Sequence, residues 1–157
     1  MSWQATKWAV NQKVGSPVRK LLLLVMSTYA DPDGKCTVAS AGHPAPYLKG
    51  AELSLEGGLP LGLSEGSSYP EVTFQLGEGE SLTFITDGVV EARAKSGELF
   101  GFERTAEIST LSAEFIALTA QAFGQDDDIT VLTLSRVAVG EPSVVEVAAP
   151  MFSPSSA

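Results

Sequence analysis

Two stretches of this sequence place carboxylates beside apolar strands, and they limit the possible folds more than any other feature. In the first, the apolar run Ser81–Ile85 leads into Asp87 and a glycine, and in the second, Asp126–Asp128 lead into an apolar run that begins at Ile129. Two strand ends of this kind can present their carboxylates to one cation, and Mg²⁺ and Mn²⁺ prefer oxygen ligands. For either stretch alone the alternative is an ordinary turn or a solvated loop, because Asp and Gly are common turn residues.

Composition and charge narrow the class of protein. The chain has 157 residues, of which 44% are hydrophobic, and this fits one soluble domain with a substantial core. A net charge of -9 argues against a nucleic-acid partner, since phosphate binding needs clustered Lys and Arg. Its single cysteine, Cys36, excludes an internal disulfide, and its single histidine, His43, excludes a Cys/His zinc site. The longest apolar run, Leu21–Met26, is too short to span a membrane, so we expect a cytoplasmic protein.

Turn signals divide the first half of the chain into hairpins. The apolar runs Leu21–Ala30 and Lys35–Ala41 flank a Pro-Asp-Gly turn, a pattern typical of an antiparallel pair. A second, shorter hairpin is expected from Tyr47–Lys49 and Glu52–Leu55.

A third hairpin is expected to lead to Asp87. Apolar and polar residues alternate along Val72–Leu76, which indicates a half-buried strand. The Gly-rich segment Gly77–Glu80 predicts a turn, after which Ser81–Thr86 would return as the partner strand. This pairing would bring Asp87 to the edge of the sheet.

The second half of the chain favours helices. We expect a short helical turn at Val89–Ala92, a short helix at Phe102–Ile108, and a longer helix capped by Ser112 and ended by Gly124. Four apolar residues fall on one face of the longer helix and are expected to pack on the sheet: Leu111, Phe115, Leu118 and Ala122.

Five short motifs occur in order along the chain: Ser40–Pro46, Gly58–Gly62, Thr86–Ala92, Gly97–Gly101 and Asp127–Thr130. In residues, order and spacing they resemble the SpoIIE-type, or RsbU-type, metal-dependent protein serine/threonine phosphatases of the PPM superfamily. The resemblance covers about Leu22 to Val137. It implies an α+β fold, a PPM-phosphatase-like antiparallel β-sandwich with flanking helices.

The resemblance also implies a metal site. It assigns Asp87 and Asp127 as metal ligands, with Asp126, Asp128 and Gly88 as further candidates to bind the metal or to hold its ligands in place. The run of three aspartates leaves the register of the second ligand open by one residue. In a complete domain two Mn²⁺ or Mg²⁺ ions would activate a water for in-line attack on a phosphoserine or phosphothreonine. No catalytic residue is expected beyond the metal ligands.

Arg93 and His43 each allow two interpretations. Arg93 could contact a substrate phosphate, because a guanidinium forks onto phosphate oxygens, or it could form a surface ion pair with a neighbouring Glu. His43 could be a general acid or base, but we interpret it as ordering its loop, since the general-acid histidine of some relatives belongs to a different segment.

One departure from the family concerns the N-terminal side. The family's domain begins with a Gly-Asp-aromatic segment, whose aspartate bridges the two metals, and none precedes Leu22 here. Residues 1–20 contain no acidic residue. We therefore expect an unassigned leader at 1–20, the C-terminal part of a phosphatase domain at 21–137, incomplete at its N-terminus, and a flexible tail at 138–157.

Two functions follow from this comparison. The first is a protein serine/threonine phosphatase in bacterial regulatory signalling, impaired by truncation, with a phosphorylated regulatory protein such as an anti-sigma-factor antagonist as substrate. The second is a non-catalytic interaction module or a remnant of the phosphatase fold. In either case we expect self-association through exposed apolar surface.

Overall fold

The computed structural model describes residues 33–60, 63–64, 66–137 and 145–147. These residues divide into two compact units. The first contains the described parts of Met1–His43 and Ser54–Gly77, and the second those of Pro44–Leu53 and Glu78–Ala157. The expected strand Leu21–Ala30 lies outside the described residues.

The first unit is built on one antiparallel pair of strands, β1 (Lys35–Val38) and β4 (Val72–Gln75). As the alternating sequence predicts, Val72 and Phe74 are half-buried while Thr73 and Gln75 are exposed. A backbone hydrogen bond of 2.8 Å from Leu76 N to Gly34 O extends the ladder beyond the strands. Cys36 is buried on β1, as expected for a structural thiol.

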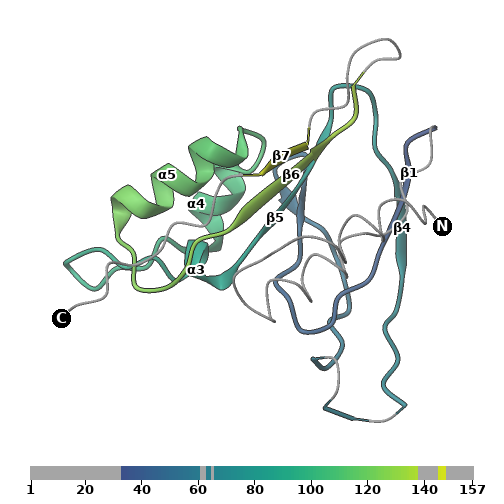
Figure 1. The fold of residues 1–157 in the computed structure, drawn as a ribbon, viewed down its shortest axis with the longest axis horizontal. Coiled ribbons are helices and arrows are strands. Elements are labelled where there is room, and N and C mark those ends of the chain that lie inside the picture. The colour runs from purple at the N-terminus through teal and green to yellow at the C-terminus, as the bar shows by residue number, and fades with distance from the viewer. Residues whose placement is uncertain (1–32, 61–62, 65, 138–144, 148–157) are drawn as a thin grey trace. The chain divides into compact units, whose positions relative to one another are not determined.

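The second unit contains an antiparallel sheet of five strands in the order β3-β2-β5-β6-β7. Figure 1 labels three of these strands, β5, β6 and β7. The bounds are β2 (Tyr47–Leu48), β3 (Ala51–Glu52), β5 (Ser81–Ile85), β6 (Val131–Ser135) and β7 (Val145–Val147). The β2–β3 hairpin is confirmed, with its turn at Lys49 and Gly50. Both turn residues have positive φ (54° and 82°), which suits the twist of a two-residue hairpin.

The expected hairpin between Val72–Leu76 and Ser81–Thr86 is wrong. Strand β4 pairs with β1, whereas β5 pairs with β2 on one side and with β6 on the other. The physical reason is the composition of β5, whose residues 82–85 are all buried and therefore need neighbours on both edges and both faces. The segment 77–80 consequently connects two ladders, and Asp87 follows a central strand.

Three helices follow the pattern expected from the sequence. They are α3 (Asp87–Val90), α4 (Gly101–Ile108) and α5 (Ala113–Phe123). The hydroxyl of Ser112 accepts a hydrogen bond of 3.2 Å from Phe115 N, so the predicted N-cap of α5 is confirmed. Gly124 ends α5, also as predicted, and its N–H donates to Ala120 O.

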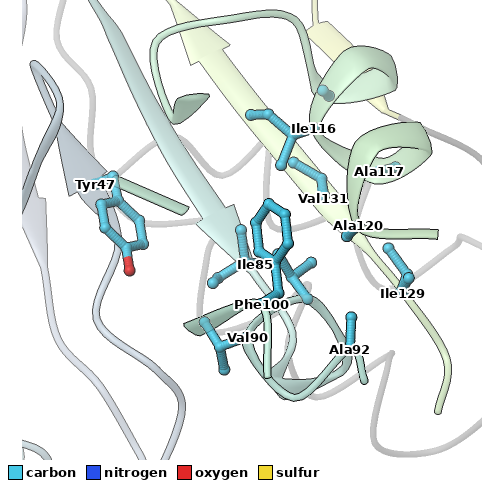
Figure 2. Packing of buried hydrophobic residues seen from close by; sticks show 12 residues of the cluster. Tyr47, Ile85, Val90, Ala92, Phe100, Ile116, Ala117, Ala120, Ile129 and Val131 are labelled. Atoms are coloured by element: carbon cyan, nitrogen blue, oxygen red, sulfur yellow. The ribbon is translucent and has the colours of Figure 1, made fainter. Parts of the chain in front are cut away.

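A single apolar cluster joins these helices to the sheet, and Figure 2 shows its side chains converging from both. Its members are Tyr47, Ile85, Val89, Val90, Ala92, Phe100, Ala113, Ile116, Ala117, Ala120, Ile129 and Val131. The rings of Phe100 and Phe123 meet edge to face, with their centroids 5.4 Å apart. The cluster includes Ile85, the last residue of β5, and Ile129, two residues before β6, so core packing positions the backbone on both sides of the predicted metal site.

The expected buried face of α5 is wrong. Its inner face consists of the small residues Ala113, Ala117 and Ala120 together with Ile116, while Leu111, Phe115, Leu118 and Ala122 are exposed. Both sets recur at helical spacing, so periodicity alone could not choose between them. The small side chains allow the helix backbone to approach the sheet closely, and this arrangement leaves the larger apolar stripe outside.

Strand β7 lies within the segment 138–157, which was expected to be a flexible tail. At residues 145–147 that expectation is wrong, because Leu132–Leu134 of β6 pair with them in antiparallel register. Two valines around one glutamate are too short a run to give a strand signal. The rest of the segment lies outside the described residues.

The expected α+β class with antiparallel strands is confirmed. Within the part of the chain that the structure describes, no helix combines the length and apolar character needed to cross a membrane.

The corrected face of α5 leads to a test by paired truncation. Ile116→Ala should lower the free energy of unfolding by about 2–5 kcal/mol, because it leaves a cavity in the cluster. Leu118→Ala should change it by less than about 1 kcal/mol, since 46% of this residue is exposed. Urea denaturation of both variants measures the difference, and equal losses would contradict the observed packing.

Candidate metal centre

The end of β5 and the start of β6 lie side by side. In the antiparallel register Ile85 is opposite Val131, so the residues after β5 and those before β6 meet at the same end of the sheet. A backbone hydrogen bond of 3.0 Å from Thr86 N to Thr130 O continues the ladder by one residue. The structure therefore brings Asp87 and the acidic run together, although by a different strand pairing from the one expected.

The hydroxyl of Thr86 adds side-chain contacts between the two segments. It donates to Asp128 O at 3.1 Å and accepts from Thr130 N at 2.9 Å. Thr86 is also the N-cap residue of α3, with extended backbone angles (φ -84°, ψ 162°). One side chain thus connects the residue that precedes Asp87 to the loop that carries the three aspartates.

Gly88 allows the two segments to touch through their backbones. A Cβ at this buried residue would lie 2.5 Å from Asp128 O and 3.0 Å from Asp128 C, closer than real Cβ atoms approach other atoms. Any larger residue would push the loop of Asp127 away from Asp87. The glycine of the Thr-Asp-Gly motif therefore has a steric role at the junction.

Asp87 and Asp127 have similar environments. Both are exposed, and each uses Oδ1 to accept the N–H of the next residue, from Gly88 at 3.0 Å and from Asp128 at 2.6 Å. These bonds restrain the carboxylates without burying them. Within the described residues, no protein donor contacts Oδ2 of either aspartate. Exposed oxygens of this kind are available to a hard cation.

Asp126 and Asp128 differ from Asp127. Asp126 Oδ2 lies 3.4 Å from Arg93 Nε in an exposed ion pair. Asp128 is half-buried and its backbone carbonyl accepts the bond from Thr86. Of the run of three, Asp127 is the one whose side chain is both exposed and uncommitted to a cationic side chain, which agrees with the register that the family resemblance implies.

Arg93 belongs to a turn that is anchored to the same loop. The residue forms an ion pair, as one of its two interpretations proposed, but with Asp126 instead of a Glu. Its Nη1 also donates to Gly97 O at 3.3 Å. Gly124 packs on the Arg93 backbone so closely that a Cβ there would overlap the Arg93 carbonyl oxygen. The start of the acidic loop is therefore held against this turn.

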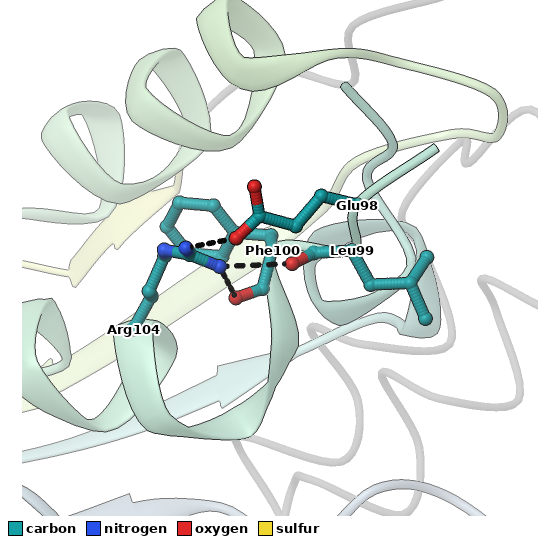
Figure 3. A network of polar contacts seen from close by, with 4 residues as sticks. All are labelled: Glu98, Leu99, Phe100 and Arg104. Atoms are coloured by element: carbon teal, nitrogen blue, oxygen red, sulfur yellow. Dashed lines mark hydrogen bonds and ion pairs between the residues drawn. The ribbon is translucent and has the colours of Figure 1, made fainter. Parts of the chain in front are cut away.

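Arg104 holds the other side of that turn, and sequence analysis did not identify it (Figure 3). Its Nη1 donates to Leu99 O at 2.9 Å and to Phe100 O at 3.1 Å, and its Nη2 pairs with Glu98. The guanidinium also lies 5.2 Å from the centre of the Phe123 ring. The feature of the sequence that could have identified Arg104 is its place one turn into the helix that begins at the end of the Gly97–Gly101 motif.

His43 belongs to the first unit. There, Ser40 Oγ donates to His43 O at 2.9 Å and accepts from His43 N at 3.2 Å. These bonds involve the backbone of His43 and not its ring, so a structural role of the ring stays a prediction.

The donor set suits Mg²⁺ or Mn²⁺ because it consists of carboxylate oxygens, and such ions bind through one or two carboxylates with water completing the shell. Within the described ranges, no group of three His, Cys, Asp or Glu side chains gathers around a common point. Asp87 and Asp127 thus fit part of a metal centre, and a centre with two ions would need further ligands.

Comparison with known proteins identifies the same family that the five motifs resemble. The sequence model of the family described as Stage II sporulation protein E (SpoIIE) matches residues 9–137. Among solved structures, the RsbU and RsbW domains of Rv1364c from Mycobacterium tuberculosis are similar, with a TM-score of 0.54 and 22% identity. The phosphatase domain of the cell fate determinant SpoIIE from Bacillus subtilis is also similar, with a TM-score of 0.50 and 16% identity.

The matches differ in how much of each protein they cover. The first covers 86% of this chain but 46% of the mycobacterial one, so this chain spans about half of that structure's length. The second covers 90% of this chain and 76% of the Bacillus domain. At these identities the structural likeness shows a shared fold. Because the family match takes in most of the sequence, the chain belongs to the SpoIIE family.

Proposed function

We propose that this chain is a metal-dependent protein phosphatase domain that hydrolyses phosphoserine or phosphothreonine in a regulatory protein. The observation that carries the proposal is the pair of hydrogen bonds that Thr86 makes with Asp128 and Thr130, which holds the segments of Asp87 and Asp127 together in a chain of the SpoIIE family. Two restrained, exposed carboxylates at adjoining strand ends are well suited to hold a divalent cation.

Asp87 and Asp127 would hold Mn²⁺ or Mg²⁺, and Gly88 keeps their segments in contact. When bound, such ions lower the pKa of a water molecule and neutralise charge on a phosphoryl group, which is the chemistry that phosphate-ester hydrolysis requires. The protein's own part is to fix both carboxylates on the ends of paired strands. Asp128 supports this arrangement from the same loop through Thr86, whereas Asp126 is paired with Arg93.

Arg93 is the side chain that we propose for substrate phosphate. Its side chain is 51% exposed, and its guanidinium is held near the acidic loop by the ion pair with Asp126. An exposed pair of this kind contributes little to stability, so its exchange for a doubly charged phosphate would cost little. Arginine binds phosphate oxygens through two parallel N–H groups, which would orient the phosphoester toward Asp87 and Asp127.

The substrate class follows from the family. We propose a phosphorylated regulatory protein, such as an anti-sigma-factor antagonist, encountered in the cytoplasm. The support is the similarity to structures named as RsbU and RsbW domains and as the phosphatase domain of a cell fate determinant.

A second function, a non-catalytic interaction module, is favoured by one observation. Within the described residues, no third His, Cys, Asp or Glu side chain joins Asp87 and Asp127 to form a group that could hold a metal ion. Residues 1–20 contain no acidic residue either, so this part of the sequence adds no carboxylate to the junction. Fewer carboxylates leave the charge of two cations less neutralised, and we propose that the 157-residue polypeptide by itself turns over substrate weakly.

Metal binding gives the first test. In calorimetric titration of the purified chain with Mn²⁺, we expect binding that Asp87→Asn and Asp127→Asn each weaken at least about tenfold, because each removes a negative ligand. Asp126→Asn is the matched control, since it removes the same charge from the same loop, and it should leave the affinity within about threefold. If all three variants weaken Mn²⁺ binding equally, the ion is attracted by the general negative charge, and the assignment of Asp87 and Asp127 as ligands is contradicted.

Turnover gives the second test. With Mn²⁺ and a phosphoserine peptide, we expect the chain to be slower by about a hundredfold or more than the Bacillus SpoIIE phosphatase domain, because two carboxylates alone would stabilise less of the charge that develops at the reacting centre. Malachite-green detection of released phosphate measures both rates. Comparable Mn²⁺-dependent turnover, abolished by Asp87→Asn, would contradict the weak-activity proposal and favour the enzyme over the interaction module.

Substrate binding gives the third test. Arg93→Ala should weaken binding of a phosphoserine peptide about tenfold, because a charge-assisted pair of hydrogen bonds is lost. Binding of the unphosphorylated peptide should not change. Fluorescence anisotropy measures both affinities, with Arg104→Lys as a control on the far side of the turn. If Arg93→Ala weakens binding of both peptides equally, the proposal that Arg93 binds the substrate phosphate is contradicted.

A further inference from the structure

We propose that Thr86 is a positioning residue that sets the spacing of Asp87 and Asp127 through its hydroxyl group. The inference rests on the metal-dependent function proposed above. Thr86 touches neither the ion nor the substrate in this proposal. It acts by tying the backbone before Asp87 to the backbone on both sides of Ile129.

The contacts of one oxygen carry the proposal. Thr86 Oγ1 donates to Asp128 O at 3.1 Å and accepts from Thr130 N at 2.9 Å. A hydroxyl has one donor hydrogen and two acceptor lone pairs, so a single side chain can satisfy both backbone groups. An isosteric valine has neither function, and would leave a carbonyl and an amide without their partner at the junction.

The hydroxyl acts where the backbone ladder alone does not define the geometry. The bond from Thr86 N to Thr130 O survives any substitution except proline, and it fixes the strands but not the loop before Thr130. The bond to Asp128 O reaches one residue from Asp127. Gly88 approaches the same carbonyl so closely that a Cβ there would lie 2.5 Å from Asp128 O, so this oxygen is in contact with the residues on both sides of Asp87.

The same strand supplies a matched control. Thr83 lies on β5 and is fully buried; its Oγ1 donates to Ser109 O at 2.7 Å, at the end of α4, and lies 3.3 Å from Thr133 Oγ1 on β6. Thr83→Val therefore removes a buried hydroxyl from the same strand, but at contacts with α4 and the middle of β6 instead of the acidic loop. Its loss of stability should equal or exceed that of Thr86→Val, since Thr86 is half-buried.

The experiment combines Mn²⁺ titration, thermal unfolding and amide exchange on the full chain with Thr86→Val, Thr86→Ser and Thr83→Val. We expect Thr86→Val to weaken Mn²⁺ binding at least about tenfold, as substitutions of groups that orient metal ligands do. Thr86→Ser keeps the hydroxyl and should stay within about threefold of the unmodified chain. Thr83→Val should lower the melting temperature without changing the affinity. Without metal, the Thr130 amide should exchange faster in Thr86→Val alone.

The outcomes separate this inference from the proposed function. If the unmodified chain binds Mn²⁺ and Thr86→Val binds it equally well, Thr86 is only structural and the inference fails while the metal function stands. If the affinity falls in parallel with stability in Thr83→Val as well, the inference also fails. If the unmodified chain does not bind Mn²⁺, the metal centre itself fails, and the inference falls with it. Selective loss in Thr86→Val, restored in Thr86→Ser, supports it.

Discussion

The antiparallel pairing of β5 with β6 is the contact on which both the core of the second unit and its candidate metal centre depend. Ile85 and Val131 are opposite each other, and both belong to the apolar cluster. The next residues outward are Thr86 and Thr130, which continue the pairing through backbone and hydroxyl bonds. The carboxylates follow directly, at the point where the ladder ends. Their positions are therefore set by the most buried part of the sheet.

Two glycines extend this arrangement beyond the strands. Gly88 allows the start of α3 to rest against the carbonyl of Asp128, and Gly124 allows the end of α5 to rest against the carbonyl of Arg93. Both contacts are between backbones, with no room for a side chain. The acidic loop between Gly124 and β6 is thus positioned at its start, through Arg93, and near its end, through Gly88 and Thr86.

The local sequence predicted much of this structure. The Ser112 cap, the end of α5 at Gly124 and the β2–β3 hairpin each depend on residues a few positions apart, and their chemistry is visible in the sequence. The meeting of Asp87 with the acidic run was also expected, because a carboxylate at the end of an apolar run predicts a strand end. The Ser/Thr specificity, the metal and the roles of the site residues stay predictions.

What the sequence did not show depends on contacts between distant segments. Pairing of β5 with β2 and β6 instead of β4 follows from the need to bury residues 82–85 on all sides, and no short window contains that information. The buried face of α5 is set by how closely the helix approaches the sheet, which favoured Ala113, Ala117 and Ala120 over the larger stripe with Phe115. The roles of Thr86 and Gly88 required knowing that Asp128 lies beside them.

The long connection between β5 and β6 has a consequence for the order of folding. Asp87 and Asp127 become neighbours only after the chain has closed a loop that contains α3, α4 and α5, which is a slow, non-local step. An unfolded chain therefore offers a cation no paired carboxylates. A cation that binds the finished junction would stabilise the folded state by mass action and slow its opening, instead of guiding the chain toward it.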